Sequence, residues 1–145
     1  NCPEDLFTVL MRRLMVKIAN RICAANDYGA IITGESVAQV ASQTLPAIFC
    51  TNAAAEYPVF RPVIGMDKRE IVDVARHIDT FEVSTLPYED CCTVFSPKHP
   101  KTRPSLEEIL AAEASFDFEP LIEKAVRETE VKQFKYGVRN VDLDM

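Results

Sequence analysis

The stretch Gly29-Ala-Ile-Ile-Thr-Gly34 is a short apolar run that ends at a glycine. Such a run predicts a buried strand followed by a tight turn. A second candidate strand, Tyr57 to Phe60, ends at Arg61-Pro62. The segment between the two strands, from Glu35 to Thr44, is predicted to be a helix. Strands and helices that alternate at this spacing indicate the α/β class, with a parallel sheet flanked by helices.

A long helix is predicted before this unit, from Glu4 to about Ala25. Its apolar residues recur at four-residue steps, which is the spacing of one helix face: Leu10, Leu14, Ile18 and Ile22. Arg12 lies at the edge of that face. A separate stripe with the same spacing is predicted to be solvated: Arg13, Lys17 and Arg21.

Further helices are predicted after the second strand. Asp67 and Glu70 form a capping-box pattern, in which Asp67 caps a helix and Glu70 reaches back to it. The apolar face that this helix is expected to bury consists of Ile71, Val74, Ala75 and Ile78. The stretch from Thr85 to Pro104 is rich in proline and predicts a long loop. Helical patterns return at 105–114 and from 120 to about 134.

The chain has 145 residues, is 48% hydrophobic and carries a formal net charge of −6. This composition predicts an ordinary core within one domain or part of a larger one. An acidic chain binds nucleic acid poorly through charge alone, so most phosphate contacts with an RNA are expected elsewhere. No apolar run approaches the roughly 20 residues that span a bilayer, and no signal peptide is recognised, so no membrane association is expected. Five irregularly spaced cysteines favour a reducing cytoplasm over a disulfide framework.

Gly34 and the polar residues after it form the first candidate site. Ligands of open α/β sheets bind at the C-terminal ends of the strands, where a glycine lets the backbone approach them. In a helix that starts at Glu35, the side chains of Glu35, Gln39 and Gln43 share one polar stripe that can read a nucleobase or ribose. The pattern also fits a turn glycine before a solvated helix face. Arg12 can bind a phosphate, or its stem can cover apolar surface while its head stays in water.

The second candidate site is the adjacent pair Cys91-Cys92, within Pro87-Tyr-Glu-Asp-Cys-Cys-Thr-Val-Phe95. A thiolate is a strong nucleophile, and nearby positive charge lowers its pKa. Acidic residues precede the pair and basic residues follow it. Residue chemistry alone is consistent with a reactive pair and equally with a buried structural pair. A zinc site that includes His99 fits poorly, because the usual C-x2-C spacing is missing, and no metal is predicted.

Several ordered motifs give the chain a resemblance to a known family. They are Met11-Arg-Arg-Leu-Met15, Thr33-Gly-Glu-Ser36, Gln39-Val-Ala-Ser-Gln-Thr-Leu45, Arg61-Pro62, Met66-Asp-Lys68, Pro87-Tyr-Glu-Asp-Cys-Cys-Thr-Val-Phe-Ser-Pro97 and Asp117-Phe-Glu-Pro-Leu-Ile122. From about Cys2 to Val126, the chain thereby resembles the ThiI family, the tRNA 4-thiouridine synthetases that are also named for thiamine biosynthesis. The resemblance implies a PP-loop domain, an α/β fold of the adenine nucleotide alpha-hydrolase-like (Rossmann-like) type.

The resemblance also implies an activity, that of an ATP-dependent tRNA sulfurtransferase. Such an enzyme adenylates O4 of a tRNA uridine and then delivers persulfide sulfur to C4, which gives 4-thiouridine. The family is linked in addition to sulfur supply for the thiamine thiazole. The implied cofactor is ATP with Mg²⁺. The implied partners are tRNA, a cysteine desulfurase as sulfur donor and a second copy in a homodimer.

Specific residues of this chain match functional positions of the family. Those that match nucleotide-contacting positions are Arg12, Gly34 and Gln43. The sulfur-bearing cysteine falls in the Cys91-Cys92 pair. Alignment on Thr93-Val94-Phe95 selects Cys92, whereas the distance from Arg61 selects Cys91, and we prefer Cys92.

The chain also departs from the family pattern. Residues 1–130 are expected to be the C-terminal portion of the PP-loop ATPase domain, and residues 131–145 a C-terminal tail. The SGGxDS pyrophosphate loop and the THUMP domain, which grips tRNA, are missing from this sequence, so the chain alone is expected to be inactive. The CxxC of cluster-bearing relatives falls on Thr8 and Met11, so no iron–sulfur cluster is predicted. No rhodanese domain is recognised, and sulfur is expected to pass directly from the desulfurase to Cys92.

Two other interpretations stay open at this point. The chain can be a PP-loop fragment of a different tRNA-modifying enzyme, which uses the same adenylation to make another product. It can also be a non-catalytic interaction or dimerisation module in which Cys91 and Cys92 are buried and inert. The reactivity of those two thiols separates the second interpretation from the enzymatic ones.

Overall fold

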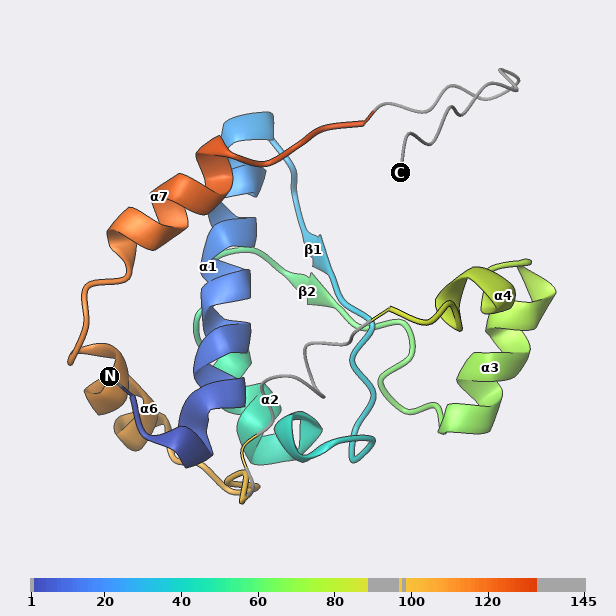
Figure 1. Ribbon diagram of the computed structural model, residues 1–145, viewed down its shortest axis with the longest axis horizontal. Coiled ribbons are helices and arrows are strands. Elements are labelled where there is room, and N and C mark those ends of the chain that lie inside the picture. The colour runs from blue at the N-terminus through green and yellow to red at the C-terminus, as the bar shows by residue number, and fades with distance from the viewer. Residues whose placement is uncertain (1, 89–96, 98, 133–145) are drawn as a thin grey trace.

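The structure is a computed structural model that describes residues 2–88, 97 and 99–132 (Figure 1). Its first half consists of η1 (Glu4–Leu6), α1 (Phe7–Asn26), β1 (Ile31–Ile32), η2 (Ala41–Gln43), α2 (Leu45–Asn52) and β2 (Val59–Phe60), where η denotes a 3-10 helix. Its second half consists of α3 (Lys68–His77), α4 (Phe81–Ser84), α6 (Leu106–Glu113) and α7 (Glu119–Arg127). Within this described part, no helix combines the length and apolarity needed to cross a membrane.

The two strands form a parallel pair in which Ile31 lies opposite Val59 and Ile32 opposite Phe60. Successive side chains of a strand point to opposite faces of the sheet. Ile31 is accordingly buried against Val16 and Cys23 of α1, whereas Ile32 is 74% exposed. The predicted α/β class with a parallel sheet is confirmed, and the prediction of a buried strand holds for one face of β1.

Most of the helices lie on one side of the two strands. In Figure 1, α2, α6 and α7 surround α1, while α3 and α4 stand apart on the other side of the strands. The larger core cluster joins residues of η1, α1, α2 and α6: Leu6, Val9, Leu10, Ala47, Cys50, Ile109 and Ala112. α1 therefore carries the core on one part of its surface and the sheet on another.

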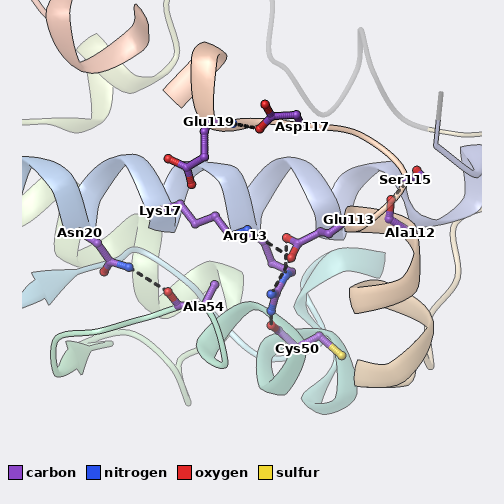
Figure 2. Close-up of polar contacts among 10 residues, drawn as sticks. All are labelled: Arg13, Lys17, Asn20, Cys50, Ala54, Ala112, Glu113, Ser115, Asp117 and Glu119. Carbon is purple, nitrogen blue, oxygen red and sulfur yellow. Dashed lines mark hydrogen bonds and ion pairs between the residues drawn. The ribbon is translucent and has the colours of Figure 1, made fainter. Parts of the chain in front are cut away.

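The first predicted helix is confirmed, but part of the predicted burial is wrong. α1 ends where Asp27 adopts a left-handed φ of 57°, a conformation that Asp tolerates better than most residues. Leu14, Ile18 and Ile22 are only partly buried. Arg13, predicted to be solvated, is 3% exposed. Its guanidinium binds the carboxylate of Glu113 and the backbone carbonyl of Cys50, which compensate the charge (Figure 2).

The helix predicted from Glu35 to Thr44 is wrong. Ala38 has a left-handed φ of 64°, which interrupts a right-handed helix, and only the short η2 forms within this segment. The backbone N–H of Ala38 donates to the carbonyl of Gln43, which closes a tight loop. The helix starts later, as α2, with Thr44 as its N-cap and Pro46 in its first turn. Thr44 and Pro46 are a standard start signal that the sequence analysis missed.

The second half matches its predictions in part. The capping box of Asp67 and Glu70 is confirmed. The burial predicted for α3 is wrong, because α3 packs mainly on the short α4 and leaves Val74 43% and Ile78 58% exposed. α6 forms as predicted behind a capping box of Ser105 and Glu108, and α7 ends at Arg127, earlier than predicted. Cys91 and Cys92 lie outside the described residues.

Candidate functional site

A cavity of about 490 Å³ lies between α1, the end of β1 and the segment that follows β2. One part of its wall is apolar and consists of Met11, Met15, Val16, Ala19, Ile31, Ile32 and Val59. The polar part includes Thr33, Glu35, Arg61 and the three predicted nucleotide-contacting residues, Arg12, Gly34 and Gln43. The fold thus brings together three residues that are spread over 32 positions of the sequence.

The parallel sheet explains why the polar residues meet. Thr33 directly follows β1 and Arg61 directly follows β2, and the C-terminal ends of parallel strands lie at one edge of a sheet. The backbone N–H of Thr33 donates to the carbonyl of Phe60 (3.0 Å), which extends the pairing to this edge. Arg12 reaches the same edge from α1. The site therefore has the location at which open α/β sheets bind ligands.

Gly34 and Gln43 shape the loop beside the cavity. A Cβ atom added at Gly34 meets no protein atom within 4 Å, so the space in front of this backbone is open. The side-chain oxygen of Gln43 accepts a hydrogen bond from the backbone N–H of Ser36 (3.2 Å). This bond uses the amide oxygen, and the amide N–H groups bind none of the residues that the structure describes. A ligand in the cavity can use those donors.

Glu35 is the centre of the charged part of the wall. Its side chain is 3% exposed. Its Oε1 binds Arg12 Nη2, and its Oε2 accepts from Arg61 Nε at 2.7 Å and from the hydroxyl of Thr33 at 3.0 Å. Arg61 is held a second time, because its Nη2 donates to Asn52 Oδ1 at 3.1 Å. The predicted polar stripe on a helix is therefore wrong for Glu35, which is the buried partner of two arginines.

The two guanidinium groups keep Glu35 ionised. Burial raises the pKa of this carboxyl, but the hydrogen bond from Arg61 and the charge of Arg12 outweigh burial and hold the pKa below its ordinary value. The charged residues of the cavity wall are two arginines and one glutamate, which leaves one net positive charge. In a chain of net charge −6, this wall is a local exception that favours an anionic ligand.

Glu35 was predicted as a candidate site residue, although on a helix, whereas Arg61 was not assigned to the site. The prediction that Arg61 lies next to a proline at the end of a strand is correct. The missing information was the pairing of the two strands, which sets Arg61 beside the loop of Glu35. The predicted cysteine pair, Cys91 and Cys92, falls outside the described residues.

Comparison with known proteins identifies the relatives of this chain. The family model described as Thiamine biosynthesis protein (ThiI) matches residues 1–118. The chain belongs to the ThiI family. The predicted resemblance to this family is confirmed.

Two curated relatives show how close the likeness is. A probable tRNA sulfurtransferase from Alkaliphilus metalliredigens is 56% identical over 132 residues, which cover 91% of this chain and 34% of that protein. The probable tRNA sulfurtransferase of Alkaliphilus oremlandii is 53% identical over 132 residues, with the same coverage of both chains. The chain spans about a third of the length of these ThiI relatives.

A solved structure supports the fold of this ThiI chain. It is a crystal structure of a 4-thiouridine synthetase–RNA complex with bound ATP. It has a TM-score of 0.79 and 37% sequence identity, and the match covers 87% of this chain and 33% of that one. The predicted fold class therefore agrees with a solved relative as well as with the elements described above.

Proposed function

We propose that this chain supplies one wall of the nucleotide site, and the sulfur-carrying cysteine, of an ATP-dependent tRNA sulfurtransferase that makes 4-thiouridine. The observation that carries the proposal is the meeting of Arg12, Gly34 and Gln43 at one cavity. These are the residues that the family resemblance implies for nucleotide contact. The names of the curated relatives and the RNA and ATP in the solved relative support the same activity.

The cavity suits an adenine nucleotide in size and chemistry. A volume of about 490 Å³ falls within the range of small-molecule sites. Its apolar wall can pack against a purine, and the amide of Gln43 can bind the base or the ribose. Arg12, at the charged end of the cavity, can bind a phosphate. ATP, with Mg²⁺ as its counter-ion, would supply the adenylation that turns the uracil oxygen into a good leaving group.

The remaining parts of the proposal concern the longer protein. Residues 1–130 form the C-terminal portion of a PP-loop domain and residues 131–145 a tail, with tRNA held mainly by a region N-terminal to this chain. Cys92 receives sulfur from a cysteine desulfurase in the cytoplasm and passes it to the tRNA, and Cys91 is the alternative carrier. No iron–sulfur cluster takes part. The full protein forms a homodimer and also supplies sulfur for the thiamine thiazole.

The test of this function uses the full-length protein that contains the chain. Unmodified tRNA, ATP, Mg²⁺, cysteine and a cysteine desulfurase are supplied, and the nucleosides of the digested tRNA are identified by mass spectrometry. The expected product is 4-thiouridine, with AMP formed in equal amount. Omission of ATP abolishes the product. A modified nucleoside other than 4-thiouridine would show that the chain belongs to a different tRNA-modifying enzyme.

The sulfur carrier is identified with two matched variants. Cys92→Ser is expected to abolish both the removable sulfur on this chain and the 4-thiouridine, because a hydroxyl cannot hold a persulfide. Cys91→Ser keeps at least part of both. The reverse result assigns the role to Cys91. Normal 4-thiouridine formation by both variants contradicts a carrier role for the pair and favours the inert interpretation of these cysteines.

A further inference from the structure

The carboxylate of Glu35 does more than neutralise one positive charge, because it also connects three separate segments of the chain. It joins α1, the loop after β1 and the segment after β2, through Arg12, Thr33 and Arg61. Three donors occupy most of the acceptor sites of one carboxylate. Glu35 is therefore engaged by the protein itself and is not available as a general base.

A stability role alone explains this centre poorly. Removing charges from water is costly, and a buried ion pair is often no more stabilising than apolar residues of the same volume. Arg12 adds a further cost, because its Nε is buried and has no hydrogen-bond partner within the described part of the chain. What the arrangement does achieve is to fix two guanidinium groups, from separate elements, in the wall of one cavity.

We propose that Glu35 is a positioning residue that holds Arg12 and Arg61 in place for the phosphate of a bound nucleotide. This inference rests on the proposed nucleotide function and deepens it. Arg12 contacts the phosphate, and Arg61, braced by Glu35 and Asn52, forms the second positive group of the same wall. Glu35 does not contact the ligand. Its effect is to order the two arginines before binding, which removes the cost of ordering them afterwards.

A positioning role and a purely electrostatic role predict opposite changes in phosphate affinity when Glu35 is replaced. Replacement of Glu35 by an uncharged residue raises the net charge of the wall from +1 to +2. If charge alone matters, Glu35→Gln binds a phosphate more tightly. If position matters, Glu35→Gln binds it more weakly, because the guanidinium groups lose their shared anchor. Adenosine, which has the base and ribose but no phosphate, reports on the rest of the cavity.

The experiment measures dissociation constants of AMP and adenosine by calorimetry in the full-length protein. For Glu35→Gln we expect AMP affinity to fall by about 10- to 100-fold, the size of a lost charge-assisted hydrogen bond. Adenosine affinity is expected to change by less than about 3-fold, within the scatter of such comparisons. Glu113→Gln is the matched control, because Glu113 is a largely buried carboxylate that also binds two basic side chains but lies outside the cavity. It is expected to leave both affinities unchanged.

A second variant keeps the inference testable if Glu35→Gln does not fold. Arg61→Lys keeps the positive charge but loses the planar fork that binds Glu35 and Asn52 together. It should lower the affinity for AMP and spare that for adenosine.

Three results overturn the inference alone, and a fourth overturns the proposed function as well. AMP binding by Glu35→Gln that is unchanged or tighter than in the wild type contradicts positioning, and so does an equal loss of AMP and adenosine binding. An unchanged ratio of the two affinities in Arg61→Lys contradicts it as well. All three leave the nucleotide site in place. If the wild-type protein binds neither AMP nor adenosine, the proposed function itself is wrong, and the positioning role of Glu35 is then wrong as well.

Discussion

Arg12 and Arg13 are neighbours in the chain, yet their guanidinium groups bind different carboxylates on different sides of α1. Arg12 binds Glu35 at the cavity, and Arg13 binds Glu113 in the core. Successive residues of a helix are about 100° apart around its axis, so adjacent side chains serve different surroundings. A single helix thereby forms part of the proposed site with one arginine and secures the packing of α6 with the other.

The Arg13–Glu113 pair is expected to dominate the polar contribution to stability. Arg13 Nε and Nη2 bind the two carboxylate oxygens of Glu113 at 2.8 and 3.0 Å, and both side chains are at most 10% exposed. Glu113→Ala leaves the buried Arg13 without its counter-charge and should cost about 3 kcal/mol or more of unfolding free energy. Urea titration of the full-length protein, followed by circular dichroism, measures this loss.

The control for that variant is Glu119→Ala. Glu119 binds Arg21 at 2.9 Å, but both side chains are more than half exposed. An exposed pair contributes about 0–1 kcal/mol. Losses of equal size in the two variants would contradict the dominant role of the buried pair.

Acid is expected to destabilise the fold through Glu35 and Glu113. Burial raises the pKa of Glu113, but the hydrogen bond and charge of Arg13 and the charge of Lys17 hold it below the ordinary value of 4.5, as for Glu35. A carboxyl with a lower pKa in the folded state stabilises that state above its unfolded pKa and ceases to do so as the pH falls through its folded pKa. Stability should therefore begin to decline near pH 4.5.

Urea titrations from pH 7 down to pH 3 follow this decline. The Glu113→Gln variant lacks one of the titrating groups, so its stability should fall less steeply over the same range. If wild type and variant lose stability in parallel, another group is responsible for the acid sensitivity.

A substitution at Gly34 is expected to weaken nucleotide binding without affecting folding. Because a Cβ atom at this position meets no protein atom and the backbone φ is outside the left-handed region, Gly34→Val should fold normally. Its side chain occupies cavity space, and we expect AMP affinity to fall by about 10-fold or more, the cost of overpacking a site. Gly29→Val is the control, since a Cβ atom there also meets nothing but Gly29 does not line the cavity. Equal AMP binding in the two variants would remove Gly34 from the site.

Cys50 should be protected from thiol reagents in the native protein. It is fully buried, its thiol faces the carbonyl of Pro104, and burial raises its pKa. Labelling then requires local opening, and we expect a rate on the order of 100-fold below that in denaturant. Mass spectrometry after timed alkylation measures the rate at each cysteine. Cys2, which is only partly buried, is the internal comparison and should label faster.

Between Gly34 and Leu45, the sequence pattern predicted a helix, but the chain forms a loop. The apolar spacing there is compatible with a helix, and no residue in it forbids one. The loop forms because Glu35 is drawn into the interior by two arginines, and because Val37 donates its backbone N–H to Ile64, far along the chain. The burial predicted for α3 is wrong for a different reason, because α3 packs mainly on the short α4, which leaves Val74 and Ile78 exposed.

The sequence by itself determined most of the elements, except the segment from Gly34 to Leu45, and three residues of the candidate site. Helix spacing, the Asp67 cap and the apolar run before Gly34 are local signals, and ordered motifs pointed to Arg12, Gly34 and Gln43. Only the tertiary structure decided which charges are buried, because the partners are remote. Arg12 and Glu35 are 23 residues apart, and Arg13 and Glu113 are 100 apart. A charge enters the interior only beside its counter-charge, and that meeting is a property of the folded chain.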